Sequence, residues 1–268
     1  MSNSSNDRRD RAAAAKSAAN LGGKRRERMI RIAGAATVLV IVFAIIAISV
    51  IAKNSDTSSP DTPVTAPTAD PNAAIPKTVF ASDSEFAFGV PSGTGAASVP
   101  ALEIWEDFQC PACEAVEKAN GAGIRELADT GKIRLIWRPT TFLDGNLNND
   151  SSLRSTAAWG CAIDAGKSVE YHDTIFGNPP LTEGDGFTNE TLIGFASDSG
   201  IEGPALDTFT KCLNDGKYLG WASNSTAAFY ASGAQGTPHA VLNGVVVPND
   251  VLADKDKLDA LVASTTAS

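Results

Sequence analysis

Two cysteines separated by two residues, Cys110 and Cys113, are the side chains whose types and spacing most clearly indicate chemistry. They follow a hydrophobic stretch, residues 101–108, that we expect to be a strand, and they begin residues 110–130, which we expect to be a helix. Backbone N–H groups and the dipole at a helix N-terminus stabilise a thiolate, so the pKa of the first thiol falls. Pro111 suits the first helical turn, where its missing N–H costs nothing. The pair predicts thiol–disulfide exchange, with Cys110 as the exposed nucleophile and Cys113 as the buried resolving thiol.

Three other interpretations of this pair fit the sequence less well. A structural zinc site needs a second pair of ligands at short spacing, whereas Cys161 and Cys212 lie about fifty residues apart. The chain has only two histidines, so we expect no metal and no organic cofactor. A purely structural disulfide between Cys110 and Cys113 would close too short a loop to stabilise much. Two unrelated buried thiols would not explain the position at a strand–helix junction.

A second motif, Gly236-Thr237-Pro238, precedes two short predicted strands, residues 239–243 and 245–247. Asn243-Gly244 between these strands is a hairpin signal. A proline that opens a strand is a candidate for a cis peptide bond, here between Thr237 and Pro238. An ordinary loop proline is the alternative. The combination with a distant Cys-x-x-Cys motif favours the cis bond.

The elements that must position these motifs follow from hydrophobic periodicity. We expect Asn120-Gly121-Ala122-Gly123 to bend or interrupt the helix that begins at Cys110. The order is β-α-β, then an all-helical block over about 150–216, then α-β-β-α, which is an α/β class. The remaining predicted strands are residues 86–90 and 132–138, and the remaining predicted helices are residues 152–166, 169–176, 189–199, 205–214, 218–232 and 251–263.

Three segments together resemble DsbA-like thiol:disulfide oxidoreductases of the thioredoxin superfamily, in the membrane-anchored bacterial form. They are residues 107–113 (DFQCPAC), Trp137-Arg138-Pro139 with Phe142-Leu143-Asp144, and Gly236-Thr237-Pro238. The resemblance covers roughly residues 80–266. It implies a thioredoxin fold with an inserted all-helical subdomain and Thr237-Pro238 packed against Cys110. It also implies that the Thr237 backbone pairs with substrate peptide and that the disulfide passes to unfolded or reduced exported proteins. A membrane reoxidase of the DsbB or VKOR type would then restore it.

The sequence departs from the family pattern at two positions. Family members often carry His or Tyr where this chain has Ala112, and a methyl group cannot help to stabilise the Cys110 thiolate. Many thioredoxin-fold enzymes also place a buried acid six residues before the first cysteine, where this chain has Ile104. Glu106 shares the strand face of Ile104 and is the candidate for that acid. The alternative is that Glu106 is solvated.

The other cysteines and the two histidines have weaker assignments. In an oxidising compartment, Cys161 and Cys212 are expected to form a structural disulfide, which would contribute up to ~4 kcal/mol. Two free buried thiols are the alternative. His239 follows Pro238 and is a candidate for the surroundings of the active disulfide, although a strand residue pointing away fits better. His172 has no identifiable partner and is expected on a helix surface. The four tryptophans are expected in the core: Trp105, Trp137, Trp159 and Trp221.

The net charge of −9 is the sum of a basic N-terminal segment and an acidic remainder. Residues 1–31, a predicted cytoplasmic basic tail, hold nine Lys/Arg and three Asp/Glu, and the remainder has a net charge of −15. The acidic total argues against nucleic-acid binding. Residues 32–52 are uncharged and long enough to cross the ~30 Å hydrocarbon core of a lipid bilayer, so we expect a single transmembrane helix and signal anchor. A cleaved signal peptide is the alternative. Residues 53–77 are expected to be a disordered Pro/Ser/Thr linker to a DsbA-like thioredoxin domain, residues 78–268.

These features predict a cell-membrane protein with its N-terminus in the cytoplasm and its catalytic domain outside. The expected function is oxidation of cysteines in exported proteins through the Cys110–Cys113 disulfide. One alternative is a reductase or isomerase of the cell envelope, for example in cytochrome maturation. Another is a chaperone or binding module without redox turnover, which would use the groove at Thr237.

Overall fold

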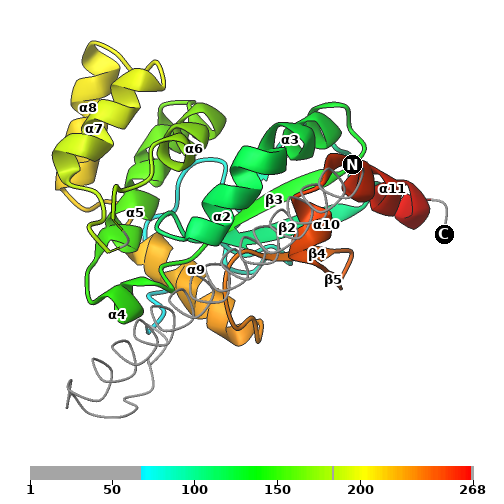
Figure 1. Ribbon diagram of the computed structural model, residues 1–268. Coiled ribbons are helices and arrows are strands. Elements are labelled where there is room, and N and C mark those ends of the chain that lie inside the picture. The colour runs from blue at the N-terminus through cyan, green and yellow to red at the C-terminus, as the bar shows by residue number, and fades with distance from the viewer. Residues whose placement is uncertain (1–67, 183, 267–268) are drawn as a thin grey trace, which may run out of the picture. The chain divides into compact units, whose positions relative to one another are not determined.

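A mixed sheet is the centre of the computed structural model, which describes residues 68–182 and 184–266. Within these residues, five strands form the sheet in the order β1-β3-β2-β4-β5 (Figure 1). Strands β2 and β3 are parallel, and the other neighbouring pairs are antiparallel. The strands are β1 (Val90–Ser92), β2 (Ala101–Glu106), β3 (Arg134–Pro139), β4 (His239–Leu242) and β5 (Val245–Val247). A mixed α/β fold is therefore confirmed.

The register of β2 brings the two sequence motifs to one edge of the sheet. Strand β2 ends at Glu106, four residues before Cys110, which is the N-cap of helix α2 (Pro111–Val116). Its antiparallel neighbour β4 starts at His239, which pairs with Trp105. Because β4 starts where β2 ends, the residues just before β4 lie beside the residues just after β2.

Alternation along β2 divides the apolar side chains between two clusters. Leu102 and Ile104 point into the main core. Trp105 points to the other face, where Phe229 of helix α9 (Leu219–Ala231) packs against its ring, with 5.6 Å between centroids. The period-2 pattern therefore places Glu106 on the same face as Ile104.

The helix after Cys110 is interrupted near the predicted Asn120-Gly121 position. Helix α2 continues into a π-helical turn, η1 (Glu117–Gly121), and then into α3 (Ala122–Asp129). Asn120 lies in this turn, and its amide donates to the carbonyl oxygen of Leu252 at 2.8 Å. A π-helical turn has i→i+5 hydrogen bonds, so it changes the rotation of α3 relative to α2.

The segment between β3 and β4 is mostly helical and gathers at one end of the sheet, in green and yellow in Figure 1. Helix α5 is central to it and contacts α6, α7, α8 and α9. All four predicted tryptophans are buried. The helices of this segment that precede α9 are α4 (Asp144–Leu147), α5 (Ser151–Asp164), α6 (Ser168–Gly177), α7 (Asn189–Asp198) and α8 (Pro204–Asn214).

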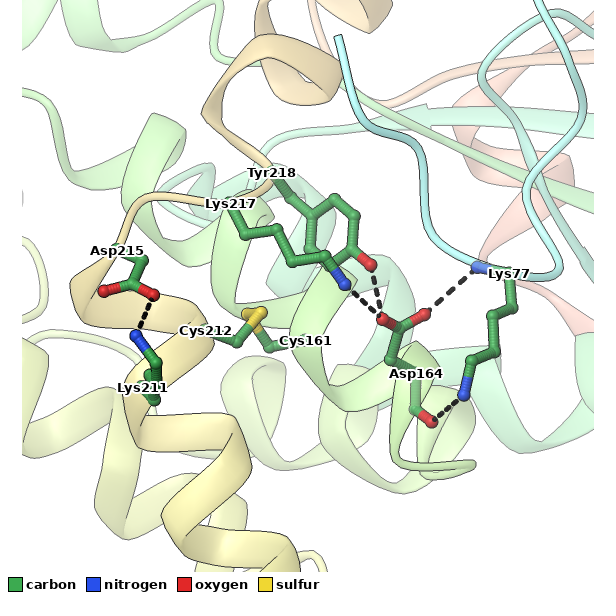
Figure 2. Close-up of a disulfide and its surroundings, with 8 residues drawn as sticks. All are labelled: Lys77, Cys161, Asp164, Lys211, Cys212, Asp215, Lys217 and Tyr218. Carbon is green, nitrogen blue, oxygen red and sulfur yellow. Dashed lines mark hydrogen bonds and ion pairs between the residues drawn. A yellow bond between two sulfur atoms is a disulfide. The ribbon is translucent and has the colours of Figure 1, made fainter.

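Cys161 of α5 and Cys212 of α8 form a disulfide, with 6.0 Å between their Cα atoms (Figure 2). Near it, Asp164 accepts hydrogen bonds from Lys217, Tyr218 and the backbone N–H of Lys77 (Figure 2). These bonds join the end of α5 to the start of α9 and to the segment that precedes the sheet.

Two predictions about the boundaries need correction. Residues 86–89 are not strand, because Phe88 has a φ of 66° and Gly89 donates back to Phe86 in a turn. The predicted terminal helix is two helices, α10 (Asn249–Leu252) and α11 (Lys255–Thr266), because the Asp254 side chain caps the second by accepting from the N–H of Lys257.

The predicted linker, 53–77, is described only from residue 68, and this described part lies against the domain. Asp70 and Asn224 exchange two hydrogen bonds of 2.7 Å. The predicted tail, 1–31, and the predicted transmembrane helix, 32–52, lie outside the described residues. Among the helices that the model does describe, none is long and apolar enough to span a bilayer.

Candidate active site

The thiol of Cys110 lies at the start of α2, beside the residues that lead into β4. Its Sγ atom is 3.3 Å from the carbonyl oxygen of Thr237. The Thr237–Pro238 peptide bond is cis. Cys110 is the N-cap residue of α2 and is only 7% exposed, so the prediction of an exposed nucleophile is wrong, because the segment before β4 covers this sulfur. Pro111 and Ala112, the residues between the cysteines, are exposed.

The two thiols have opposite electrostatic environments. The Cys113 thiol, the Thr237 side chain and the backbone N–H groups of Cys113 and Ala112 stabilise the Cys110 thiolate, and together they outweigh burial and lower its pKa from 9.0 to about 6. Burial of Cys113, together with its hydrogen bond to Cys110 and the charge of Glu106, raises the pKa of the second thiol well above the ordinary value. At neutral pH the reduced pair therefore holds one thiolate, on Cys110, and one thiol, on Cys113. This asymmetry suits a nucleophile and a resolving thiol.

A cavity of about 190 Å³ opens beside Cys110. The loop after α6 supplies Pro179 and Pro180 to one wall, and α6 itself supplies Ile175 and Phe176. Its lining is mostly apolar, so the cavity can receive an apolar side chain next to the reacting sulfur.

His172 is not on the surface as predicted. Its side chain is buried, with the residue 2% exposed, and its Nε2 atom lies 3.1 Å from Oε2 of Glu106. The Glu106 side chain is buried as well, which excludes the solvated alternative. The sequence indicated only that His172 lies on a helix, because three of the four rings that cover it come from other segments, and only Phe176 belongs to α6 itself. They are Trp137 at 4.4 Å between centroids, Phe176 at 4.9 Å, Trp159 at 5.3 Å and Phe108 at 5.8 Å.

Further charged side chains continue from His172 toward the surface. Asp173 Oδ1 lies 3.5 Å from His172 Nδ1 and 2.9 Å from Arg125. Arg125 also pairs with Glu117 at 3.3 Å. Burial opposes the charged form of His172, but its hydrogen bonds to Asp173 and Glu106 and the charge of Glu117 outweigh that effect and raise its pKa. Burial likewise raises the pKa of Glu106.

Glu117, His172 and Asp173 offer ligand atoms within 4.8 Å of one another, close enough to hold a metal ion. Arg125 already supplies a positive charge to both carboxylates of this group. We therefore assign these side chains as an ion-pair network and not as metal ligands.

A polar network that sequence reasoning missed holds the loop before Cys110. Asp107 is fully buried and accepts from the Ser152 hydroxyl at 2.5 Å and from the backbone N–H of Leu143 at 2.9 Å. The Gln109 amide donates to Ser152 Oγ at 2.8 Å and to Asp144 Oδ1 at 2.9 Å. The sequence contained one signal for this network, which is that two of its polar residues directly precede the Cys-x-x-Cys motif. The network joins the loop before Cys110 to the start of α5.

His239 lies at the start of β4, opposite Trp105. Residues directly opposite in an antiparallel pair point to the same face, so His239 shares the face of Trp105 and not that of Glu106. It is also absent from the described residues that line the cavity at Cys110. The structure therefore brings Cys110, Cys113, Thr237, Pro238 and Glu106 to one region and places His239 on the other face.

The chain is similar to known proteins in sequence and in fold. A model of the thioredoxin family matches residues 90–262. The chain has no match among curated proteins. MdbA from Actinomyces oris, a thiol-disulfide oxidoreductase, is 25% identical, with a TM-score of 0.62 over 74% of this chain and 95% of that chain.

Two further solved structures share the fold at lower identity. Oxidised DsbA from Mycobacterium tuberculosis is 23% identical, with a TM-score of 0.54 over 67% of this chain and 93% of that chain. Oxidised BdbD from Bacillus subtilis is 17% identical, with a TM-score of 0.59 over 74% of this chain and all of that chain, 100%. With the Cys110–Cys113 dithiol at the helix N-terminus, this chain belongs to the thioredoxin family and is a thiol–disulfide oxidoreductase of that family.

Proposed function

We propose that the protein is an extracytoplasmic oxidase that introduces disulfides into exported proteins through Cys110 and Cys113. The observation that carries this proposal is the lowered pKa of Cys110, about 6, beside the raised pKa of Cys113. A stabilised Cys110 thiolate favours the reduced enzyme, and a stable reduced form makes the enzyme disulfide a stronger oxidant. The asymmetry therefore supports donation of a disulfide more than its reduction.

The reaction proceeds by two exchanges. A substrate thiolate attacks the Cys110 sulfur of the oxidised enzyme, the Cys110–Cys113 bond breaks, and Cys113 leaves and becomes a thiol. A second substrate thiolate attacks the substrate sulfur of this mixed disulfide and releases Cys110 as its thiolate. Two electrons pass from the substrate dithiol to the enzyme pair, and the substrate leaves with a disulfide.

Thr237 and Pro238 form the surface against which the substrate chain lies. The Thr237 carbonyl is already 3.3 Å from the Cys110 sulfur, so a peptide joined to that sulfur is within reach of the Thr237 backbone. The apolar cavity beside Cys110 receives a side chain next to the substrate cysteine. Unfolded chains expose both backbone and apolar side chains, which suits reduced proteins as substrates.

The reduction potential of the Cys110–Cys113 pair tests this function. The protein is equilibrated in glutathione buffers and the redox state is read by thiol alkylation and mass spectrometry, with Cys110→Ser as the baseline that reports the other cysteines. We expect a potential above about −200 mV, toward those of protein disulfide isomerase and DsbA. A potential near the ~−270 mV of thioredoxin would reject the oxidase and favour a reductase. Full function in the Cys110→Ser variant would instead support a module without redox turnover.

The proposed location is the cell membrane, with residues 32–52 as a single-pass anchor and the catalytic domain outside. The long uncharged stretch and the basic residues before it support this placement. The Cys161–Cys212 disulfide supports an oxidising compartment. Protease accessibility in intact cells and carbonate extraction of membranes test it. We expect a protease-sensitive domain in the membrane pellet, and release into the soluble fraction with a new N-terminus after residue 49 would support a cleaved signal instead.

The proposed partners are reduced exported proteins and a membrane reoxidase of the DsbB or VKOR type. A Cys113→Ser variant cannot resolve its mixed disulfides, so it should hold both partners covalently at Cys110. Partners are released with reductant and identified by mass spectrometry, with the Cys110→Ser/Cys113→Ser double variant as the control. Exported proteins and a polytopic membrane protein are expected. Exclusively cytoplasmic proteins would contradict the proposal.

A further inference from the structure

The cavity beside Cys110 has a lining that suits an apolar side chain. Its walls are mostly rings and aliphatic groups, from Phe108, Pro111, Ile175, Phe176, Pro179 and Pro180. Gln109 also lines it, but the amide of Gln109 is already bonded to Ser152, Asp144 and Asn149. An apolar group therefore enters this cavity without leaving the Gln109 amide unpaired.

The size and position of the cavity define what occupies it. Its volume of about 190 Å³ is below the ~300–1,000 Å³ of pockets that hold whole small molecules, so it fits a single side chain. Cys110 is itself one of the lining residues. A chain joined to the Cys110 sulfur therefore brings its neighbouring residue directly to the cavity. The occupant is the residue next to the substrate cysteine.

The loop after α6 forms one side of the cavity mouth, and we call its described residues, 178–182 and 184–186, the rim. Leu181 lies between Pro180 and Gly184, which both line the cavity, and its own side chain is fully exposed. A single exposed leucine is ordinary on a protein surface. At the mouth of a reactive cavity it has a further use, because a chain that crosses the mouth covers it and removes apolar area from water.

Hydrogen bonds tie the rim to the loop that carries Cys110. The side-chain amide of Asn149 donates to the carbonyl oxygen of Gly184 at 3.1 Å and to Oε1 of Gln109 at 3.0 Å. Gln109 directly precedes Cys110 in the chain. On the other side of the rim, two consecutive prolines, residues 179–180, restrict backbone rotation. The rim is thus positioned before a substrate arrives, which lowers the entropic cost of contact with it.

Glu114 gives the cavity its charge. It is the only charged side chain among the described residues that line the cavity. It lies on α2, one turn after Cys110, and its ion-pair partner is Lys118, whose side chain is 57% exposed. A carboxylate at this position repels an acidic residue of a bound chain and does not repel a neutral or basic one.

We propose that the cavity and the rim select substrate cysteines that have an apolar residue next to them, with Leu181 and Glu114 as specificity-determining residues. Leu181 covers the apolar side chain, and Glu114 disfavours an acidic one. This inference deepens the proposed function and rests on thiol exchange at Cys110. It implies that protein thiols are preferred over glutathione, whose cysteine stands between a γ-glutamyl group and a glycine.

The test measures thiol exchange at Cys110 at equilibrium. The full-length Cys113→Ser protein, in lipid nanodiscs, is converted to its mixed disulfide with glutathione and then mixed with a single-cysteine peptide. The peptide thiolate attacks the Cys110 sulfur, the bond to the glutathione sulfur breaks, and glutathione leaves as its thiolate. One disulfide replaces another, so no external oxidant takes part. Intact-mass spectrometry gives the ratio of the two mixed disulfides, and the same exchange in unfolding urea corrects for differences between the peptide thiols.

The peptides place leucine, glycine, glutamine or glutamate directly before or directly after the cysteine. We expect leucine to be favoured over glycine about tenfold or more in one of the two orders, because its side chain leaves water for the cavity. We expect glutamate to be at least about twofold weaker than glutamine, with a difference that shrinks as salt is added. These comparisons use a single protein, so they do not depend on further variants folding.

Two variants with matched controls assign these effects to residues. Leu181→Ser should reduce the leucine preference at least about threefold. Val246→Ser should leave it unchanged, because Val246 is an exposed apolar residue of β5 that is not among the residues lining the cavity. Glu114→Gln should abolish the difference between glutamate and glutamine peptides. Glu126→Gln should keep that difference, because Glu126 is on α3 and also pairs with a lysine but does not line the cavity.

Equal exchange constants for the leucine and glycine peptides in both orders would overturn the inference. So would a leucine preference that Leu181→Ser and Val246→Ser reduce equally, or a discrimination against glutamate that survives in Glu114→Gln. A failure of the proposed function looks different. In that case Cys110 forms no mixed disulfide with any thiol, or the reduction potential is that of a reductase while the leucine preference persists.

Discussion

The Sγ atom of Cys110 lies 3.3 Å from the carbonyl oxygen of Thr237, although 127 residues separate the two in the chain. A carbonyl oxygen accepts the S–H of the neutral thiol, so this contact serves the protonated form. The thiolate is stabilised by the Cys113 thiol first, then by the Thr237 side chain and by the N–H groups of Cys113 and Ala112. Cys110 is thus held between one backbone acceptor and several groups that stabilise its thiolate.

The first prediction concerns the protonation of Cys110. In the reduced protein, thiolate absorbance near 240 nm should titrate with a midpoint near pH 6, because the donors at α2 lower the pKa from 9.0 to about 6. Cys110→Ser should remove this transition, and Cys113 should add none below pH 9, since burial raises its pKa. A midpoint above pH 8 would contradict the electrostatic account of the site.

The second prediction is the pH dependence of stability in the reduced form. Between pH 6 and pH 9 the folded state has released the Cys110 proton, whereas the unfolded chain retains it. Stability therefore rises with pH across this window, and this contribution is lost as pH falls through 6. The difference between the pKa of Cys110 in the unfolded and the folded state corresponds to roughly 4 kcal/mol of the free energy of unfolding, at ~1.4 kcal/mol per pKa unit.

Urea unfolding at pH 5.5 and pH 8.5, compared between the reduced wild type and Cys110→Ser, measures this contribution. Other buried acids titrate in both proteins, so the difference between the two isolates Cys110. The oxidised protein, which has no Cys110 thiol, should lack the contribution. An identical pH dependence in wild type and variant would show that the Cys110 pKa is the same in the folded and unfolded states.

The third prediction concerns the Cys161–Cys212 disulfide, which closes a segment with a sequence separation of 51 residues. Replacing both cysteines with alanine should lower the free energy of unfolding by about 3–4 kcal/mol, because the unfolded chain regains the freedom of that loop. Urea unfolding under non-reducing conditions measures the loss. The Cys110 titration should keep its midpoint, since the disulfide joins α5 to α8. A change below about 1 kcal/mol would show that the loop is already restrained by packing.

The fourth prediction compares two fully buried serines on α5. Ser152 donates to Asp107 and accepts from Gln109, so Ser152→Ala should cost about 1–3 kcal/mol by leaving a buried carboxylate short of a donor. Ser155 donates to the backbone of its own helix at Ser151, so Ser155→Ala should cost less than about 1 kcal/mol. Thermal unfolding of both variants measures the difference. Equal costs would mean that the Asp107 network does not hold the catalytic loop to α5.

The sequence by itself determined the features whose causes are local. A proline after Cys110 and a strand before it are sufficient to begin a helix at that cysteine, because capping and hydrophobic alternation act over a few residues. Asn243-Gly244 likewise determined the hairpin, and both residues adopt positive φ. The helical block was predicted from periodicity within its own segments.

Only the tertiary structure decided which polar groups are buried. His172 is on a helix whose local pattern does not distinguish a surface position from a core position, and its burial depends on aromatic rings from β3 and α5. Asp107 is buried because α5 brings Ser152 to it from 45 positions away. Such contacts depend on how distant elements pack, and so does the electrostatic environment of Cys113. The reactive pair could therefore be predicted from the sequence, whereas the groups around it that shift its pKa values could not.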